Sequence, residues 1–368
     1  MMQIDRTQMQ NVVSEIQTEH ADQELHWLIS QVITPEFPQI IEALGICSNL
    51  ILYNSPQHPD AQKQIERGPE IKLPVSSSKS EALKGIIVRD GAYVTQMTVQ
   101  LKESHFNKIL NKMTLKKPVL LPQIIGAKKS IDAAVGLIER ASSEVLDDNC
   151  DQEHTRLIAM FHQMLCEIQI AKNSLQLPTD PELVFPLNVT PASSFSPVLT
   201  PNIAVDLYIS QAEVCVDLKY LHQVQDHPWC EIDSQGKSYV DKLRDDMRLP
   251  SSHVSRSSTP AAPQPLNMAD IEQKIHQSAS TTPDGSRSQS NFVNNVWNHI
   301  SLKPKHDPID YITKCVTYNN MVVMVGKKIE VSSPDPVLVS ALTKLDSVEY
   351  LVSSFLENLQ KVVDSLHQ

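Results

Sequence analysis

The C-terminal stretch from Asp335 to Leu366 places the strongest constraint on how this chain folds. It contains no glycine, and its only proline, Pro336, falls in the first turn, where helices tolerate proline. Apolar residues recur at steps of three or four residues, the heptad spacing of an amphipathic helix. They are Leu338, Leu342, Leu345, Val348, Val352, Phe355, Leu359, Val362 and Leu366.

An apolar stripe of this length requires a partner, because burying each side chain contributes about 1.5–3 kcal/mol before the entropy cost of ordering it. The partner is either a second copy of the chain, as in a leucine zipper, or earlier helices of the same chain. We favour the second, because three other segments offer matching stripes. We therefore predict an internal structural seam formed by Leu338, Leu342, Leu345, Val352, Phe355, Leu359, Val362 and Leu366.

The three matching segments carry apolar residues at helical spacing. Residues 24–47 predict a helix that two prolines kink or split. Residues 119–146 and 151–175 predict two further helices, and the short turn between them implies antiparallel neighbours. Residues 1–19 are polar and expected to be loose, and residues 54–80, rich in Pro, Ser, Gln and Lys, are expected to form a long loop.

Three stretches predict antiparallel β-hairpins. In residues 83–101, Asp90-Gly91 is the predicted two-residue turn, which pairs Arg89 with Ala92 and places Ile86 and Val88 on the apolar face. Residues 203–220 alternate about a turn at 210–211, and a bent helix over 211–223 is the alternative. Residues 321–331 predict a third pair of strands with its turn at 326–327.

The order of these elements predicts the α+β class, with an antiparallel four-helix bundle lobe and an antiparallel β-sheet lobe in which the hairpins join one sheet. The bundle lobe comprises residues 20–53, 119–175 and 335–366. The β lobe comprises residues 83–118, 203–224 and 309–332. Residues 225–290, rich in Ser and Pro, predict a long disordered insertion.

Composition narrows the functional classes. The chain has 368 residues and a net charge of −11, which disfavours a nucleic-acid partner. The N-terminus does not read as a signal peptide, and no apolar run is long enough for membrane insertion. There are only nine glycines, and no GxGxxG, P-loop or GxSxG motif can be written, which removes most nucleotide-binding and α/β-hydrolase classes.

No cluster of residues predicts chemistry. One group has four potential zinc ligands, but its spacing matches no known zinc module, so a metal site is not favoured: Cys215, His222, His227 and Cys230. Cys47, Cys166 and Cys315 lie in apolar contexts, typical of buried thiols rather than nucleophiles. A basic run from Lys112 to Lys129 could touch anionic lipid or an acidic partner, but a solvated face is favoured. We predict no enzyme activity, no catalytic residue and no cofactor.

Several short blocks occur in the order seen in one known family. They are residues 24–28 (ELHWL), 83–87 (LKGII), 205–209 (VDLYI), 214–218 (VCVDL), 220–222 (YLH) and 326–331 (GKKIEV). On these blocks the chain resembles the Rogdi family, also called leucine-zipper-domain proteins. The resemblance covers most of the chain outside residues 1–19, 54–80 and 225–290. The long serine-rich insertion departs from the shorter animal members and fits a fungal member.

The resemblance implies an elongated protein with a helical lobe and a β lobe. It implies a non-enzymatic adaptor subunit of the fungal RAVE complex, which promotes reassembly of the vacuolar H⁺-ATPase and thereby organelle acidification. The implied partners are a large β-propeller scaffold subunit, peripheral-sector subunits of the V-ATPase, and a small adaptor shared with SCF ubiquitin ligases. The implied location is cytoplasmic, with peripheral recruitment to vacuolar and endosomal membranes.

Two other functions remain in view from the residues. The first is a homodimeric coiled-coil scaffold protein unrelated to the V-ATPase, in which the C-terminal stripe is exposed for self-pairing. The second, an unrecognised hydrolase, is the least favoured, because the chain has few glycines and no recognisable site.

Overall fold

The computed structural model describes residues 6–77, 82–107, 110–145, 153–178, 181–187, 189–248 and 306–366. The chain divides into two compact units. Unit 1 comprises Met1–Val198, Val205–Asp217 and Ile329–Gln368, and unit 2 comprises Leu199–Ala204 and Leu218–Lys328. Helices and antiparallel sheets occur together, so the predicted α+β class is confirmed.

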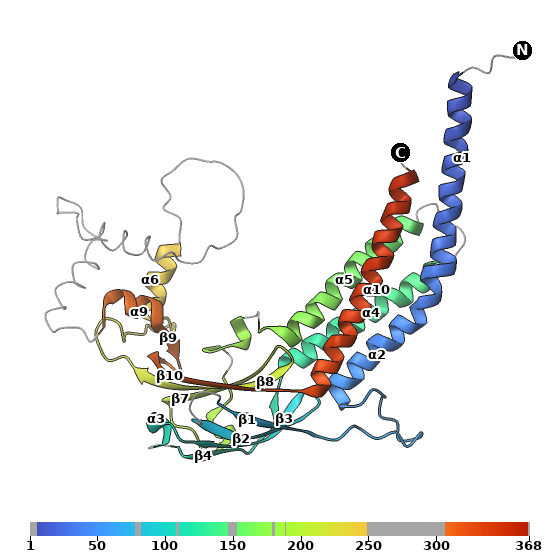
Figure 1. Cartoon of the computed structure of the whole chain (residues 1–368). Helices are drawn as coiled ribbons and strands as arrows, with labels where there is room; N and C mark the ends of the chain where they lie inside the picture. The colour runs from blue at the N-terminus through green and yellow to red at the C-terminus, as the bar shows by residue number, and fades with distance from the viewer. Residues whose placement is uncertain are drawn as a thin grey trace, which may run out of the picture. The chain divides into compact units, whose positions relative to one another are not determined.

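Unit 1 contains the long helices. They are α1 (Arg6–Trp27), α2 (Phe37–Tyr53), α4 (Pro122–Val145), α5 (Glu153–Gln176) and α10 (Pro336–Leu366). Helix α10 packs against α2 and α5, α4 packs against the same two helices, and α1 runs along α10 (Figure 1). Each of the four long segments that were predicted to be helical overlaps one or more of these helices, although residues 119–120 of the second segment form a strand instead.

The N-terminal region differs from the prediction. Residues 1–19 were expected to be loose, but α1 begins at Arg6. The helix predicted over residues 24–47 is split, which is one of the two predicted effects of its prolines: a π-helix over Leu28–Ile33 and a 3₁₀ turn over Thr34–Glu36 connect α1 to α2. Such a change of helical type accommodates a proline that lacks an N–H donor, and the Thr34 hydroxyl donates to the Ile29 carbonyl at 2.8 Å.

The first sheet also lies in unit 1. Its described strands are β1 (Ile71–Ser76), β2 (Leu83–Asp90), β3 (Tyr93–Leu101), β4 (Lys112–Leu115), β5 (Val119–Leu120) and β6 (Phe195–Ser196). The order is β1-β2-β3-β4-β6, and β5 pairs with β3. The predicted loop over residues 54–80 is therefore wrong in part, because β1 extends the sheet beyond the hairpin. A short helix α3 (Ser104–Asn107) connects β3 to β4.

The register of the β2–β3 hairpin differs from the prediction. Asp90 pairs with Tyr93 and Arg89 with Val94, so the turn residues are Gly91 and Ala92. Gly91 has a φ of +57°, which a type II′ turn requires at its first central position. A bulge at Thr95 shifts the pairing again, as Val88 pairs with Gln96. The buried face consequently carries Leu83, Ile87, Arg89, Met97 and Val99, whereas Ile86 and Tyr93 are exposed.

The second sheet has the order β7-β8-β10-β9, so the expectation of a single sheet is wrong. Strands β7 (Ile203–Ser210) and β8 (Glu213–Gln223) form the predicted hairpin, and the helical alternative is excluded. The turn lies one residue later than predicted, at Gln211 and Ala212, whose φ values of 53° and 57° are typical of a type I′ turn. Strands β7, β8 and β10 each begin in one unit and end in the other.

The predicted third hairpin has the wrong turn. Residues Met321–Pro334 form one continuous strand, β10, which pairs with β9 (Cys315–Tyr318) through a turn at Asn319-Asn320. Both asparagines adopt positive φ, which asparagine tolerates better than most residues. Gly326 serves a different purpose within the strand: a Cβ there would lie 2.1 Å from Cδ2 of His222, so only glycine leaves room for that ring.

Unit 2 has a small core of its own. Trp229 stacks on Tyr311 with ring centroids 4.9 Å apart, and α6 (Tyr239–Arg248) and α9 (Pro308–Lys314) pack together beside this pair. Arg244 of α6 donates to the Ile312 and Cys315 carbonyls at 2.7 and 2.6 Å. The predicted disordered insertion therefore does not begin at residue 225. Its remainder, from residue 249 to residue 290, lies outside the described residues.

Candidate functional site

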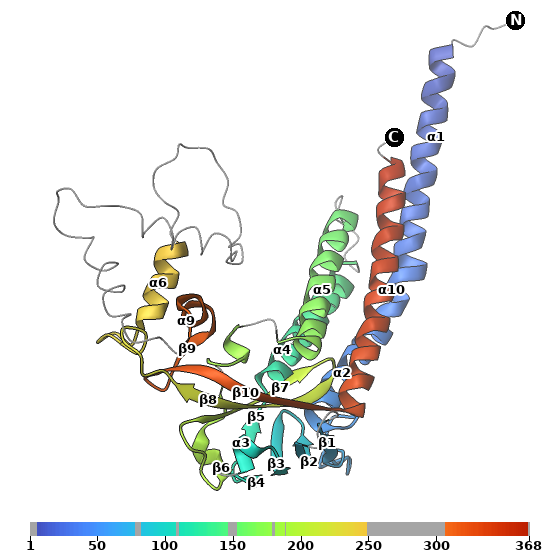
Figure 2. The ribbon, with the colours of Figure 1, turned by 60° about the vertical axis from the view of Figure 1, so that its left-hand side comes forward.

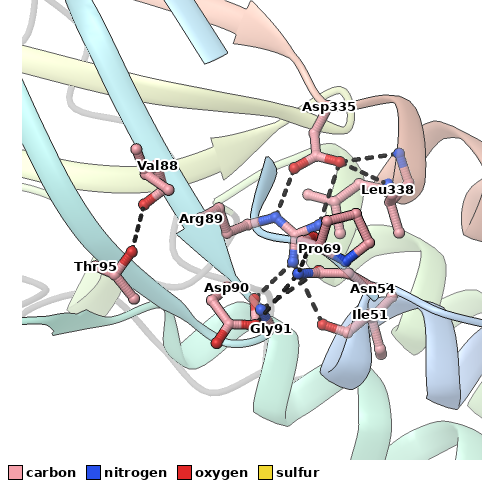
Figure 3. A network of polar contacts seen from close by, with 11 residues as sticks. Ile51, Asn54, Pro69, Val88, Arg89, Asp90, Gly91, Thr95, Asp335 and Leu338 are labelled. Carbon is pink, nitrogen blue, oxygen red and sulfur yellow. Dashed lines mark hydrogen bonds and ion pairs between the residues drawn. The ribbon is translucent and has the colours of Figure 1, made fainter. Parts of the chain in front are cut away.

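The most constrained site of unit 1 is built around Arg89, a fully buried arginine in β2. Its Nε donates to Oδ2 of Asp335 at 2.5 Å, and its Nη2 donates to Oδ1 at 3.2 Å, which makes the pair bidentate (Figure 3). Its Nη1 donates to the carbonyl of Gly91 at 2.6 Å and lies 3.5 Å from that of Ile51. The guanidinium tolerates burial because its N–H donors have hydrogen-bond acceptors in the plane of the group.

Asp335 also forms the N-cap of α10. Its Oδ1 accepts from the backbone amides of Val337 and Leu338 at 2.9 and 3.1 Å, as an Asp followed by a proline in the first turn predicts. Its own amide donates to the carbonyl of Ala212, in the β7–β8 turn, at 3.2 Å. One side chain and its backbone therefore connect β2, the start of α10 and the β7–β8 hairpin.

Asn54 completes the site from the end of α2. It is the C-cap residue of α2, with a φ of 55°, and its Nδ2 donates to Oδ1 of Asp90 at 3.3 Å and to the carbonyl of Pro69 at 3.2 Å. Its Oδ1 accepts from the amide of Gly91 at 3.4 Å. A Cβ at position 91 would lie 2.2 Å from the carbonyl oxygen of Leu52, so glycine is required where the turn meets the helix.

We refer to Arg89, Asp335, Asn54 and Gly91 as the junction. Arg89 faces the C-terminal carbonyls of α2, and Asp335 faces the N-terminal amides of α10, so each charge opposes the partial charge of a helix end. Both side chains are 0% exposed, which excludes direct contact with a substrate. The junction is therefore a structural lock that joins two helices to two hairpins.

Local sequence pattern does not predict this lock. The predicted register places Arg89 on the face opposite Ile86 and Val88, and the helical pattern identifies Asp335 only as the start of a helix. A signal was present, because Arg89 follows three apolar residues in a strand, and Asp335 precedes a proline at a helix start. Neither signal identifies the other residue as its partner, since they are 246 positions apart.

A second buried polar contact fixes the edge of β7. Gln123, in the first turn of α4, is buried and both donates to and accepts from the backbone of Ile209, each at 2.7 Å. The same amide donates to the carbonyl of Ser174 near the end of α5 at 3.0 Å. The glutamine thus substitutes for a neighbouring strand at an edge position.

The eight residues of the predicted seam lie on α10. Leu338, Leu345, Val352, Phe355 and Leu359 are buried, Leu342 and Val362 are half-buried, and Leu366 ends the helix. Phe161 of α5 lies between Phe355 and Phe37 of α2, with ring centroids 6.4 and 6.3 Å away. The Cys47 thiol of α2 lies 3.6 Å from the Ala341 carbonyl. The role of these eight residues as the organising seam stays a prediction.

The outer face of the first sheet carries lysines. Lys84 pairs with Gln100, which pairs with Lys112. In β1, Lys72 lies on the same face, four residues before Ser76, the partner of Lys84. We call these three residues the lysine face. The one carboxylate at an outer position of β1 to β4, Asp90, is in an ion pair with Arg67 at 2.8 Å. In a chain of net charge −11, this face is locally positive.

The residues considered above as nucleophiles or metal ligands show no sign of a chemical role in the described part of the structure. Burial raises the pKa of the Cys47 and Cys215 thiols to about 12 and that of Cys315 to about 11, which suppresses the nucleophilic thiolate. Cys166 is exposed, so its predicted burial is wrong. Among the described residues, no three His, Cys, Asp or Glu side chains are grouped to hold a metal ion. No helix in that part of the chain is long and apolar enough to cross a bilayer.

Comparison with known proteins places these features in a family. A family model described as "Rogdi leucine zipper containing protein" matches residues 24–360. The chain belongs to this Rogdi leucine zipper family. It is also similar to "Regulator of V-ATPase in vacuolar membrane protein 2" of Saccharomyces cerevisiae, with 22% identity over 358 residues that cover 92% of this chain and 91% of that protein. Both residues of the ion pair, Arg89 and Asp335, lie within the stretch that the Rogdi model matches.

Proposed function

We propose that this chain is a non-enzymatic regulator of the vacuolar H⁺-ATPase that acts by binding other proteins. The observation that carries the proposal is the similarity to the yeast V-ATPase regulator, which extends over nearly the full length of both chains. The Rogdi family model matches residues 24–360, a range that contains the four residues of the junction, so the similarity is not confined to one short motif.

The specific form of the proposal is an adaptor subunit of a RAVE complex that promotes assembly of the V-ATPase and organelle acidification. Its partners are a large β-propeller scaffold subunit, peripheral-sector subunits of the V-ATPase, and the small adaptor shared with SCF ubiquitin ligases. The protein acts in the cytoplasm and is recruited peripherally to vacuolar and endosomal membranes.

In the proposed mechanism, the protein is a rigid scaffold that holds its binding surfaces in a fixed arrangement for its partner proteins. The junction holds the start of α10, the end of α2 and the β2–β3 turn in one arrangement. The lysine face lies on the sheet that this lock supports, and it fits a protein partner with an acidic surface. A stable scaffold contact would bury about 1,200 Å² or more in total, which exceeds what three lysines supply, so other residues must contribute.

The homodimeric coiled-coil alternative has less support. Its central requirement is an apolar stripe available to a second chain. Leu338, Leu345 and Leu359 have no exposed surface, and α10 packs against α1, α2 and α5 of its own chain.

The proposal is tested in cells of the source organism that lack this chain. Wild-type protein carrying an affinity tag should restore organelle acidification, measured with a ratiometric pH probe, and should co-purify with V-ATPase subunits in mass spectrometry. The triple charge reversal Lys72→Glu/Lys84→Glu/Lys112→Glu should reduce both, because it places like charges against an acidic partner.

The matched control reverses exposed lysines elsewhere, Lys63→Glu, Lys237→Glu and Lys361→Glu, and should behave as wild type. Normal acidification without the chain, together with the absence of V-ATPase subunits from the purified material, rejects the function. If the function stands but both triple variants behave alike, the lysine face is not the contact surface.

A further inference from the structure

Helix α1 has two unlike faces. Ala21 and Leu25, followed by Leu28 at the start of the π-helix, are buried on the side from which α1 packs against α10. In both views the N-terminal part of α1 continues past the end of α10 (Figure 2). A helix segment without a neighbour is marginal in water, because most helical stability in proteins comes from packing an apolar face. The exposed residues of α1 that the structure describes, between Glu15 and Trp27, are therefore available to a partner from outside this chain.

The opposite face of α1 carries a stripe of exposed residues at helical spacing. We call it the α1 stripe: Ile16, His20, Gln23 and Trp27, separated by four, three and four residues. Ile16 is 49% exposed and Trp27 is 57% exposed, although these are large apolar side chains. Anchors at such spacing are how a helix docks against another helix or a groove, and tryptophan is the residue type most enriched among binding hot spots.

The charges around the stripe are of one sign. Glu15, Glu19, Asp22 and Glu24 are all exposed on α1, and no lysine or arginine occurs between Arg6 and Lys63. At about 100° per residue, Glu19 and Glu24 flank the stripe on its two sides. The surface therefore offers apolar anchors within an acidic border.

We propose that the α1 stripe is the docking site for a basic amphipathic helix of another protein. The apolar side of that helix covers Ile16 and Trp27, and its lysines or arginines meet Glu19 and Glu24. Two other occupants fit less well. A second copy of α1 brings its own Glu19 and Glu24 against the same two carboxylates, and an anionic bilayer repels the same border. This site stands on α1 alone and does not depend on the V-ATPase assignment.

The test measures binding of a defined peptide to the full-length chain by fluorescence anisotropy. The probe is a labelled peptide of leucine and lysine, patterned as an amphipathic helix of about five turns. A leucine–glutamate peptide of the same pattern is the charge control. Wild-type protein should bind the leucine–lysine peptide and not the leucine–glutamate peptide.

Variants then assign the site. Trp27→Ala should weaken binding about 30-fold, the effect of removing a hot-spot side chain. Its matched control is Tyr350→Ala, which removes an aromatic ring that is 78% exposed on α10, and it should bind as wild type. Glu19→Gln/Glu24→Gln should weaken binding about two- to fivefold and reduce its salt dependence, whereas Glu66→Gln/Glu70→Gln should do neither.

Each contrary result overturns the proposal. These results are no binding of the leucine–lysine peptide to wild type, equal binding by Trp27→Ala, or equal binding of the leucine–glutamate peptide. Sedimentation that shows a wild-type dimer and a Trp27→Ala monomer assigns the stripe to self-association instead. Binding to phosphatidylserine vesicles that is lost in Trp27→Ala assigns it to a membrane.

Discussion

Helix α10 is held in place by two kinds of interaction: a buried ion pair and helix cap at its start, and apolar packing along its length. Its start is fixed at the junction, where one buried carboxylate serves Arg89 and two helix amides together. Its length is held by apolar contacts spread over several turns, with Phe355 and Leu359 near the far end. The junction depends on directional contacts of a few atoms, whereas the apolar contacts are shared among many side chains.

This difference between directional and distributed contacts indicates where the fold tolerates substitutions least. A buried ion pair gains little over an apolar substitute, but removing one partner leaves a charge without solvent or counter-ion. An apolar contact that is lost leaves a cavity, and the neighbours relax into part of it. We therefore expect a single substitution at the junction to cause a large loss of stability, whereas substitutions along α10 should cause losses that vary with the burial of each side chain.

The largest effect is expected for Asp335→Asn. Asparagine keeps an acceptor for the helix cap, so the variant isolates the loss of charge opposite Arg89. We expect a loss of about 3–5 kcal/mol in the free energy that protects the first turns of α10, measured by native-state hydrogen exchange.

The double variant Arg89→Met/Asp335→Asn provides the control for Asp335→Asn. It removes both charges, and methionine follows the apolar part of the arginine chain, so it should be more stable than Asp335→Asn alone. The single variant Arg89→Met is measured as well. If the stability loss of the double variant equals the sum of the losses of the two single variants, the ion pair does not couple these elements, and the contrast with the apolar contacts is wrong.

A graded effect is expected along the apolar contacts. Leu345→Ala should cost about 2–5 kcal/mol, because the side chain has no exposed surface and its removal leaves a cavity. Val362→Ala should cost less, since Val362 is only half-buried near the end of the helix. Urea unfolding, followed by the helical circular dichroism signal, measures both losses in unfolding free energy. Equal losses would contradict the expectation that apolar packing contributes less toward the end of α10.

The smallest effect is expected at an ion pair on the rim of the apolar contacts. Lys172 of α5 binds Asp346 of α10 at 2.6 Å and also contacts Glu349. Burial alone would lower the pKa of Lys172, but hydrogen bonds to the two carboxylates raise it above its usual 10.5. Lys172→Met should cost about 0.2–1 kcal/mol near neutral pH, where a partly exposed pair is screened by solvent.

The sign of the pH dependence follows from the raised pKa of Lys172. Its stabilisation is fully present below the unfolded-state pKa and is lost as the pH rises through the folded-state value. The difference in unfolding free energy between wild type and Lys172→Met should therefore stay constant from neutral pH to about pH 10 and shrink above it. A difference that grows with alkaline pH would exclude this pair as its source.

Several elements followed directly from local pattern. The heptad spacing of residues 335–366 predicted α10 to within a residue, and alternation about Gln211 predicted the β7–β8 hairpin. The reason is that helix and strand periodicity are properties of neighbouring residues. Strand β1 escaped prediction because Ile71–Ser76 is short and contains a proline, and it becomes a strand only by pairing with β2.

The sequence by itself determined the long helices other than α1, the α+β class and the membership of the Rogdi family, because each depends on periodicity or on ordered short motifs. The tertiary structure alone decided the hairpin register, the long strand β10, and above all the pairing of Arg89 with Asp335. A charged residue is stable in a core only when a counter-charge is buried beside it, and the counter-charge of Arg89 is 246 positions away in the sequence. No local pattern around either residue contains the position of the other.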